Sequence, residues 1–195
     1  MSDPLIRLAG WIDEARRRGA PEPEAMALAT ATPHGVPSVR VVLCRGIDSR
    51  GIRFFTNYES RKGLELEQNP RAAACFFWAI LDAQVRVEGP VERLPASESD
   101  DYFGHRPRGH RLSALASPQS RPIESMEALR TRSRQIASDY EGRDVPRPLW
   151  WGGYKLTASA VEIWTRGADR LHERIRFERR DAGPDATWDS VRLAP

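Results

Sequence analysis

Short apolar segments separated by turn residues constrain the fold of this chain more than any other feature. In one of them Val85, Val87 and Val91 alternate with polar residues, which is the period of a strand with one buried face. Five such segments occupy the first half of the sequence, at 25–32, 39–44, 52–56, 72–78 and 84–92. Short turns join antiparallel neighbours, whereas parallel strands need a long crossover. The sequence therefore predicts an antiparallel sheet or barrel rather than βαβ units.

Helices are expected to flank this sheet. Asp3-Pro4 begins an amphipathic helix, because Asp3 suits the N-cap and Pro4 the first helical position. Further helices are expected at 60–68, 97–103 and about 124–140, and further strands at 155–164, 172–179 and 187–193. The segment 106–111 is rich in charge, Gly and Pro and is expected to be irregular. No linker or repeat divides the sequence, so we expect one α+β domain over residues 1–195, an antiparallel β-barrel with flanking helices.

Composition excludes several classes of protein. Thirty basic and twenty-seven acidic residues leave a net charge of only +3, too small to indicate nucleic-acid binding. The sequence has no stretch of 18 apolar residues and no apolar leader, so we expect a cytoplasmic protein without a membrane partner. Cys44 and Cys75 lie in strand-like sequence without a CxxC pair, which indicates reduced thiols.

Several common site motifs are missing from the sequence. It has no Gly-rich dinucleotide or Walker loop and no GxSxG nucleophile. His105, His110 and His172 lack the spacing of metal ligands, and the first two lie among arginines that would repel a cation. We therefore expect no metal site.

The first candidate site is the segment Phe54–Gly63, in which an apolar strand end passes through a polar turn into a helix beginning at Ser60-Arg61-Lys62. A helix N-terminus presents free N–H groups and the positive end of its dipole, so it attracts phosphate. Two cations and a hydroxyl at that position predict an anion site. The alternative is a capped surface helix with solvated charges.

The second candidate is Arg170-Leu171-His172-Glu173-Arg174. If this segment is a strand, alternation places Arg170, His172 and Arg174 on one face. Such a face suits a pocket for an anionic or electron-rich ligand, and the alternative is a solvated face with carboxylates on the neighbouring strand.

Polar and aromatic residues in other strand segments are weaker candidates. Arg40 and Arg45 bound an apolar run, and alternation over five positions places them on opposite faces. Gln84 carries an amide that both donates and accepts hydrogen bonds. Trp164, at a strand end, suits either the core or a ligand.

Taken together, these segments resemble the pyridoxamine 5′-phosphate oxidase family, the FMN enzymes that make pyridoxal 5′-phosphate. The resemblance covers nearly the whole chain and depends on six segments in order: Phe54–Gly63, Gln84–Gly89, Tyr102-Phe103 with Arg106-Pro107-Arg108, Ser117–Ser120, Trp151–Tyr154 and Arg170–Arg174. It implies a split β-barrel FMN-binding fold and a homodimer with FMN at the interface.

The resemblance also implies roles for particular residues. Its FMN contacts fall on Arg40, Phe55, Thr56, Arg61, Lys62, Gln84, Gln119, Ser120, Trp164 and Arg174. Its substrate contacts fall on Arg45, Tyr102, Arg106, His110, Arg170 and His172. Arg170 and His172 are the implied catalytic residues, positioning the substrate against the flavin. The implied reaction oxidises pyridoxamine or pyridoxine 5′-phosphate to pyridoxal 5′-phosphate, with O2 as acceptor and H2O2 released.

Two departures concern the substrate-phosphate site. Arg45 replaces a Lys of the family and His110 replaces a Ser, and an Arg differs from a Lys in size and in the direction of its donors. An oxidase with a repacked phosphate pocket fits this pattern. So does a related FMN oxidase acting on another reduced ring, such as a dihydrophenazine in phenazine biosynthesis. A flavin-binding protein with little turnover is a third alternative, but it would need neither Arg170 nor His172.

Overall fold

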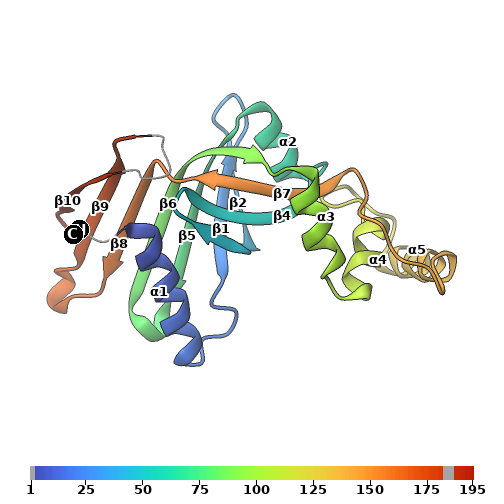
Figure 1. Cartoon of the computed structure of the whole chain (residues 1–195), viewed down its shortest axis with the longest axis horizontal. Coiled ribbons are helices and arrows are strands. Elements are labelled where there is room, and N and C mark those ends of the chain that lie inside the picture. Colours follow the sequence, from blue (N-terminus) through green and yellow to red (C-terminus); the bar gives the residue numbers. More distant parts are fainter. Residues whose placement is uncertain (1–2, 182–186) are drawn as a thin grey trace.

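The computed structural model describes residues 3–181 and 187–195, and a curled antiparallel sheet forms its centre (Figure 1). In these described residues the strands are β1 Ala25–Ala31, β2 Pro37–Leu43, β3 Gly46–Asp48, β4 Gly51–Asn57, β5 Arg71–Trp78, β6 Ala83–Arg93, β7 Trp151–Thr157, β8 Ala160–Thr165, β9 Glu173–Arg179 and β10 Trp188–Leu193. The main path runs β10-β9-β8-β6-β5-β1-β2, while β4 pairs with β3 and β7, and β7 also pairs with β6. The predicted antiparallel architecture is confirmed.

Strand β6 connects the two parts of the sheet. Its first half, Ala83–Glu88, pairs with β8, and its last residues, Val91–Arg93, pair with β7. Between them Gly89 lies so close to the backbone that a Cβ there would sit 1.9 Å from the carbonyl oxygen of Thr157. A glycine is therefore required where the long strand bends from one part of the sheet into the other.

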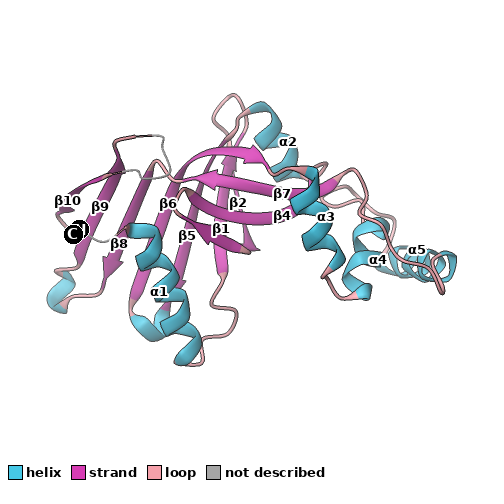
Figure 2. Ribbon diagram, in the orientation of Figure 1, coloured by secondary structure: helices cyan, strands magenta, loops and turns pink. Residues whose placement is uncertain are grey.

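Helices flank the sheet on two sides, as Figure 2 shows. They are α1 Pro4–Arg17, α2 Arg61–Gln68, α3 Ala96–Gly104, α4 Arg108–Ala116 and α5 Met126–Asp139, with short 3-10 turns at Ala79–Leu81 and Ala168–Arg170. Helix α1 covers the sheet near β6 and β8, whereas α3, α4 and α5 extend beyond β4 and β7 (Figure 2). None of the helices in the described part of the chain is long and apolar enough to cross a membrane.

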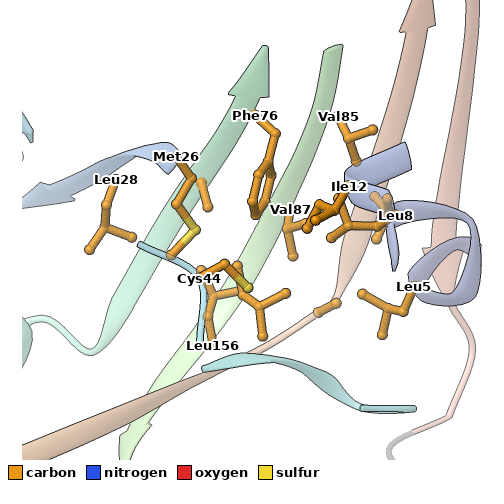
Figure 3. Packing of buried hydrophobic residues seen from close by; sticks show 14 of the residues in the cluster. Leu5, Leu8, Ile12, Met26, Leu28, Cys44, Phe76, Val85, Val87 and Leu156 are labelled. Carbon is orange, nitrogen blue, oxygen red and sulfur yellow. The ribbon is translucent and has the colours of Figure 1, made fainter. Parts of the chain in front are cut away.

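The main core lies between α1 and the concave side of the sheet (Figure 3). Leu5, Leu8 and Ile12 of α1 are buried there, and the Asp3 carboxylate accepts a hydrogen bond from the Leu5 backbone N–H at 2.7 Å, as expected for the N-cap. Cys44 also lies in this core, and both cysteines have free thiols. Burial of these side chains fixes α1 on the sheet.

A second, smaller core joins α3 and α4 to the barrel. Phe103 and Val145 pack against Trp151 at the start of β7, and Phe55 of β4 contacts the same cluster. This core anchors the segment that carries Tyr102 and the residues after it.

The strand predicted at 155–164 is two strands. β7 ends at Thr157 and β8 begins at Ala160, because the intervening backbone changes partners: the Ala158 N–H donates to the Arg50 carbonyl and the Ser159 N–H to the Glu88 carbonyl, each at 2.8 Å. The apolar pattern continues through this crossover, so alternation alone did not reveal the break.

The prediction that residues 106–111 are irregular was wrong from Arg108 onward, because α4 begins there. Pro107 precedes the helix, a position at which its missing N–H costs nothing. The Arg108 guanidinium donates to the carbonyl oxygens of Tyr140 and Arg143, at 2.5 and 2.8 Å. These bonds to the end of α5 hold the helix in place despite Gly109 in its first turn.

Replacing Gly63 by alanine should destabilise the protein, because a Cβ there would lie 2.0 Å from the Tyr58 carbonyl oxygen. We expect the free energy of unfolding to fall by roughly 1–3 kcal/mol. The control is Gly10→Ala in α1, where a Cβ has no neighbour within 4 Å and should stabilise the helix by about 0.5–1 kcal/mol. Urea unfolding measures both variants, and a Gly63→Ala protein as stable as wild type would contradict this account.

Candidate functional site

A cavity of about 940 Å³ opens beside β2, the turn from β4 into α2, and α3 with α4. Its size falls within the range of small-molecule and cofactor sites. Most of the predicted site residues line it, namely Arg40, Arg45, Phe55, Thr56, Arg61, Lys62, Tyr102, Arg106, His110, Gln119 and Ser120. We call this set the cavity group.

Lys62 is the most buried cation of the cavity group, at 7% exposure. Its ammonium donates to Thr56 Oγ1 at 2.9 Å, Gln119 Oε1 at 3.1 Å and Ser60 Oγ at 3.2 Å. All three acceptors are neutral, and none of the carboxylates in the described residues forms an ion pair with Lys62. Burial, and then the nearby charge of Arg40, lower the pKa of Lys62 to about 8. A buried ammonium without a counter-charge suits an anionic ligand.

The position of Lys62 follows from the helix predicted at 60–68. Ser60 caps α2, with its side chain accepting from the Gly63 N–H at 3.4 Å, and the helix begins at Arg61. Arg61 and Lys62 therefore occupy the first turn, where the helix dipole adds to their charge. The structure therefore places two cations and a capping hydroxyl at the start of this helix, the arrangement from which an anion site is predicted.

Arg45 lines the same cavity as Arg40, although strand alternation was expected to place the two on opposite faces. Strand β2 ends at Leu43, and beyond it the side chains no longer alternate. The apolar run had suggested a longer strand.

Stacked aromatic rings form one wall of the cavity. The rings of Phe55 and Tyr102 are nearly parallel with centroids 3.8 Å apart, and Trp151 lies 5.7 Å from Phe55. The Arg106 guanidinium lies 4.6 Å from the Trp151 ring. Arg106 Nη1 is buried and has no hydrogen-bond partner among the described residues. A buried donor without an acceptor costs free energy. An acceptor atom on a ligand would remove that cost at Arg106 Nη1.

The remaining predicted residues form a second group, none of which lines the cavity. Gln84 of β6 pairs in register with Trp164 of β8, and Trp164 pairs with Arg174 of β9. Their side chains project from the face opposite the buried Val85 and Ile163. We call Gln84, Trp164, Arg170, His172 and Arg174 the β6–β9 group.

Arg170 and His172 do not lie on a strand with Arg174, so that prediction was wrong. β9 begins only at Glu173, and Arg170 has a left-handed backbone with φ of 63°. His172 nevertheless joins the β6–β9 group, because its ring lies 4.7 Å from the Trp164 ring. Its Nδ1 accepts a hydrogen bond from the Gly167 N–H at 3.2 Å. A neutral His172 held in this way carries its proton on Nε2.

The two groups lie far apart within one chain. Arg40 is on β2, at one end of the sheet path, and Arg174 is on β9, next to the other end. Five strand spacings of about 4.8 Å separate these two strands along the sheet (Figure 1). The structure therefore sorts the predicted residues into two separate surfaces.

Sequence reasoning missed the carboxylates that hold the site arginines. Glu65 contacts Arg61 at 2.9 Å, and Glu162 contacts Arg174 at 3.0 Å. Both carboxylates are buried. The spacing of four residues between Arg61 and Glu65 in a predicted helix was a usable signal. The sequence held no such signal for Glu162, because its partner Arg174 lies on the neighbouring strand.

Two family profiles match this sequence. The profile described as Pyridoxamine 5′-phosphate oxidase matches residues 12–138, and the profile described as Pyridoxine 5′-phosphate oxidase C-terminal dimerisation region matches residues 151–195. The chain is 49% identical over 194 residues to the pyridoxine/pyridoxamine 5′-phosphate oxidase of Salinibacter ruber, covering 99% of this chain and 89% of that protein. The protein of the same name from Cupriavidus taiwanensis is 49% identical, with 99% and 89% covered.

Solved structures with the same fold confirm the expected split barrel. PhzG of Burkholderia lata 383, in complex with tetrahydrophenazine-1-carboxylic acid, superposes with a TM-score of 0.92 and is 35% identical, covering 100% of this chain and 94% of that one. A pyridoxamine 5′-phosphate oxidase-related, FMN-binding protein of Nostoc punctiforme superposes with a TM-score of 0.77 over 100% of both chains. It is only 19% identical, so that likeness concerns the fold alone.

Proposed function

The chain belongs to the pyridoxamine 5′-phosphate oxidase family of FMN-dependent oxidases, and we propose that it oxidises pyridoxine or pyridoxamine 5′-phosphate to pyridoxal 5′-phosphate. The alcohol loses two electrons and two protons, and O2 takes them up as H2O2. With the amine, water enters and ammonia also leaves. FMN supplies the two-electron chemistry when bound, and the protein supplies binding and orientation.

One observation carries this proposal: predicted residues outside the cavity gather at Trp164, where Gln84 and Arg174 are its cross-strand partners and the His172 ring lies 4.7 Å from its ring. Seven expected FMN contacts belong to the cavity group and three to the β6–β9 group, while four substrate contacts belong to the first and two to the second. We infer a homodimer of single-domain chains, in which the cavity group of one subunit meets the β6–β9 group of its partner. The match to a C-terminal dimerisation region supports this arrangement.

The cavity group fits the phosphate of FMN. In the described residues the hydrogen-bond acceptors of the buried Lys62 ammonium are all neutral, and Arg40 and Arg61 line the same cavity. Backbone N–H groups at the start of α2 add to their attraction for a dianion. In the β6–β9 group, Gln84 carries the donor and acceptor that a flavin's polar edge requires, and Trp164 offers an aromatic surface.

The mouth of the cavity fits a second phosphate, that of the substrate. Arg45 and Arg106 both line it, Arg106 Nη1 is buried without a partner among the described residues, and Tyr102 and His110 lie beside them. Arg45 stands where the family has a Lys. It keeps the positive charge, and its guanidinium can donate two parallel hydrogen bonds to phosphate oxygens. These residues hold the substrate, while Arg170 and His172 of the partner subunit act on its reacting end. His172 would donate from Nε2 rather than serve as a base, because its Nδ1 already accepts a bond from Gly167.

A second candidate is oxidation of a reduced tricyclic ring without a phosphate. The likeness to PhzG at 35% identity favours it, because that protein was solved with a tetrahydrophenazine carboxylic acid. Its carboxylate could also pair with Arg45 or Arg106. The cationic mouth of the cavity favours the dianionic phosphate ester over this monoanion.

An anaerobic flavin spectrum separates the two candidates. We expect pyridoxine 5′-phosphate to bleach the protein-bound flavin within one turnover, and air to restore its colour with about one H2O2 per flavin. A tetrahydrophenazine carboxylic acid should bleach it more slowly. Faster bleaching by the tricyclic acid would move the assignment to the second candidate, and a flavin that stays oxidised with both would contradict the oxidase proposal.

Binding of FMN should take up a proton above about pH 8. Without ligand the pKa of Lys62 is about 8, and a bound dianion favours the charged form and raises that pKa. Near pH 7 the ammonium is charged in both states, so no proton moves at Lys62. As the pH rises from about 8 to 10 the free protein loses this proton first, and FMN affinity falls.

Calorimetry at about pH 9 in two buffers of different ionisation enthalpy measures this uptake. The control is Lys62→Met, which should bind FMN more weakly at every pH and show no uptake near pH 9. Equal binding enthalpies in both buffers for the wild-type protein would contradict the assignment of Lys62 to the phosphate.

A further inference from the structure

Glu65 is a buried carboxylate to which the sequence assigned no role. It lies on α2 one turn after Arg61, and only 6% of its side chain is exposed. Its oxygens accept four hydrogen bonds, from Arg61 Nε at 2.9 Å, Thr30 Oγ1 at 2.5 Å, Ser38 Oγ at 2.5 Å and Arg40 Nη2 at 3.5 Å. The donors come from β1, β2 and α2, so Glu65 ties these three elements together.

Two hydroxyls relay the contact between Glu65 and Arg40. Thr30 and Ser38 pair in register across β1 and β2, so their side chains share a face. Arg40 Nη1 donates to Thr30 Oγ1 at 2.6 Å, Arg40 Nη2 donates to Ser38 Oγ, and both hydroxyls donate onward to Glu65. Arg40 Nη1 also reaches the Leu28 carbonyl at 3.2 Å. The guanidinium of Arg40 is therefore held on both of its terminal nitrogens.

Charge explains why a carboxylate is needed at this position. Arg40, Arg61 and Lys62 line one cavity, and burial lowers the pKa of Arg40 and of Lys62, which means that their charged forms are costly there. Burial alone would raise the pKa of Glu65, but the bonds from Ser38 and Thr30 and the charge of Arg61 lower it to about 2. Glu65 is thus an anion throughout the physiological range and offsets part of this repulsion.

We propose that Glu65 is a positioning residue for the cofactor phosphate: it orients Arg40 directly and through Thr30 and Ser38, and it orients Arg61 by their ion pair. The inference rests on the proposed function, which assigns Arg40, Arg61 and Lys62 to the phosphate of FMN. Glu65 itself does not line the cavity. Its effect is to fix two guanidinium groups before the ligand arrives, which lowers the entropy lost on binding.

Two effects of Glu65 on phosphate binding have opposite signs. Its negative charge repels the phosphate, whereas its hydrogen bonds orient the arginines. Orientation outweighs repulsion here, because four hydrogen bonds satisfy the Glu65 carboxylate and the site keeps three cations against one anion. Loss of the carboxylate should therefore weaken FMN binding rather than strengthen it.

The test compares FMN with riboflavin, which lacks the phosphate, by quenching of flavin fluorescence. Glu65→Gln keeps the size of the side chain but turns one acceptor oxygen into a donor that faces other donors. We expect its Kd for FMN to rise roughly tenfold or more, equivalent to about 1.4 kcal/mol, while its Kd for riboflavin changes less than about twofold. The matched control is Glu67→Gln on the same helix, whose exposed carboxylate pairs with Arg93 and which should leave both values unchanged.

A second variant guards against a Glu65→Gln protein that does not fold. Ser38→Ala removes one relay hydroxyl and keeps the carboxylate, and we expect about a threefold rise in the Kd for FMN alone. Unchanged FMN affinity in Glu65→Gln, tighter binding, or an equal loss for FMN and riboflavin would each overturn the positioning role.

The FMN affinity of Lys62→Met shows whether a negative result concerns the role of Glu65 or the phosphate site of the proposed function. If Lys62→Met weakens FMN binding while Glu65→Gln and Ser38→Ala do not, the phosphate site stands and the role of Glu65 is overturned. If Lys62→Met leaves the FMN affinity unchanged, the phosphate assignment fails and the positioning proposal fails with it.

Discussion

The structure depends on a cluster of positive charge at the start of α2, in which Lys62 is buried, Arg40 is partly buried and Arg61 is exposed. Lys62 has three neutral acceptors, and Arg40 and Arg61 share one carboxylate between them. Burying the Lys62 ammonium without a counter-charge costs free energy. The phosphate that we propose at the start of α2 offsets that cost. The local fold, with Ser60 as cap and Gly63 tight against Tyr58, keeps the cations at the helix end.

The sheet explains why a second copy of the chain is needed. Its path separates β2 from β9 by five strand spacings, and the proposed site, which needs both the cavity group and the β6–β9 group, therefore draws on two subunits. Between them the outer face carries exposed apolar side chains, with Val39 at 68%, Val41 at 69% and Phe77 at 56% exposure. Such a face is typical of a surface that a partner covers. In the proposed two-fold dimer this face is buried, and each cavity group lies against a β6–β9 group of the partner subunit.

The sequence predicted the antiparallel sheet, the capped first helix and the helix at 60–68, because each has a strong local pattern. The errors have a common physical cause in contacts between distant residues. The break at Ala158-Ser159 depends on the Arg50 and Glu88 carbonyls, and the start of α4 depends on carbonyls at the end of α5. The resemblance to a family supplied the site residues, but it did not separate them into two groups. That division became visible only once strand order was known.

The central claim is that each active site combines residues of two subunits, and a mixed dimer tests it most directly. Lys62→Met damages the cavity group and Arg174→Ala the β6–β9 group, so each homodimer should have little oxidase activity. A heterodimer of the two variants, isolated with two different affinity tags, would hold one intact site and one doubly damaged site. The account predicts about half of wild-type activity for this heterodimer. Activity no higher than that of either homodimer would show that both groups act within one chain and would contradict it.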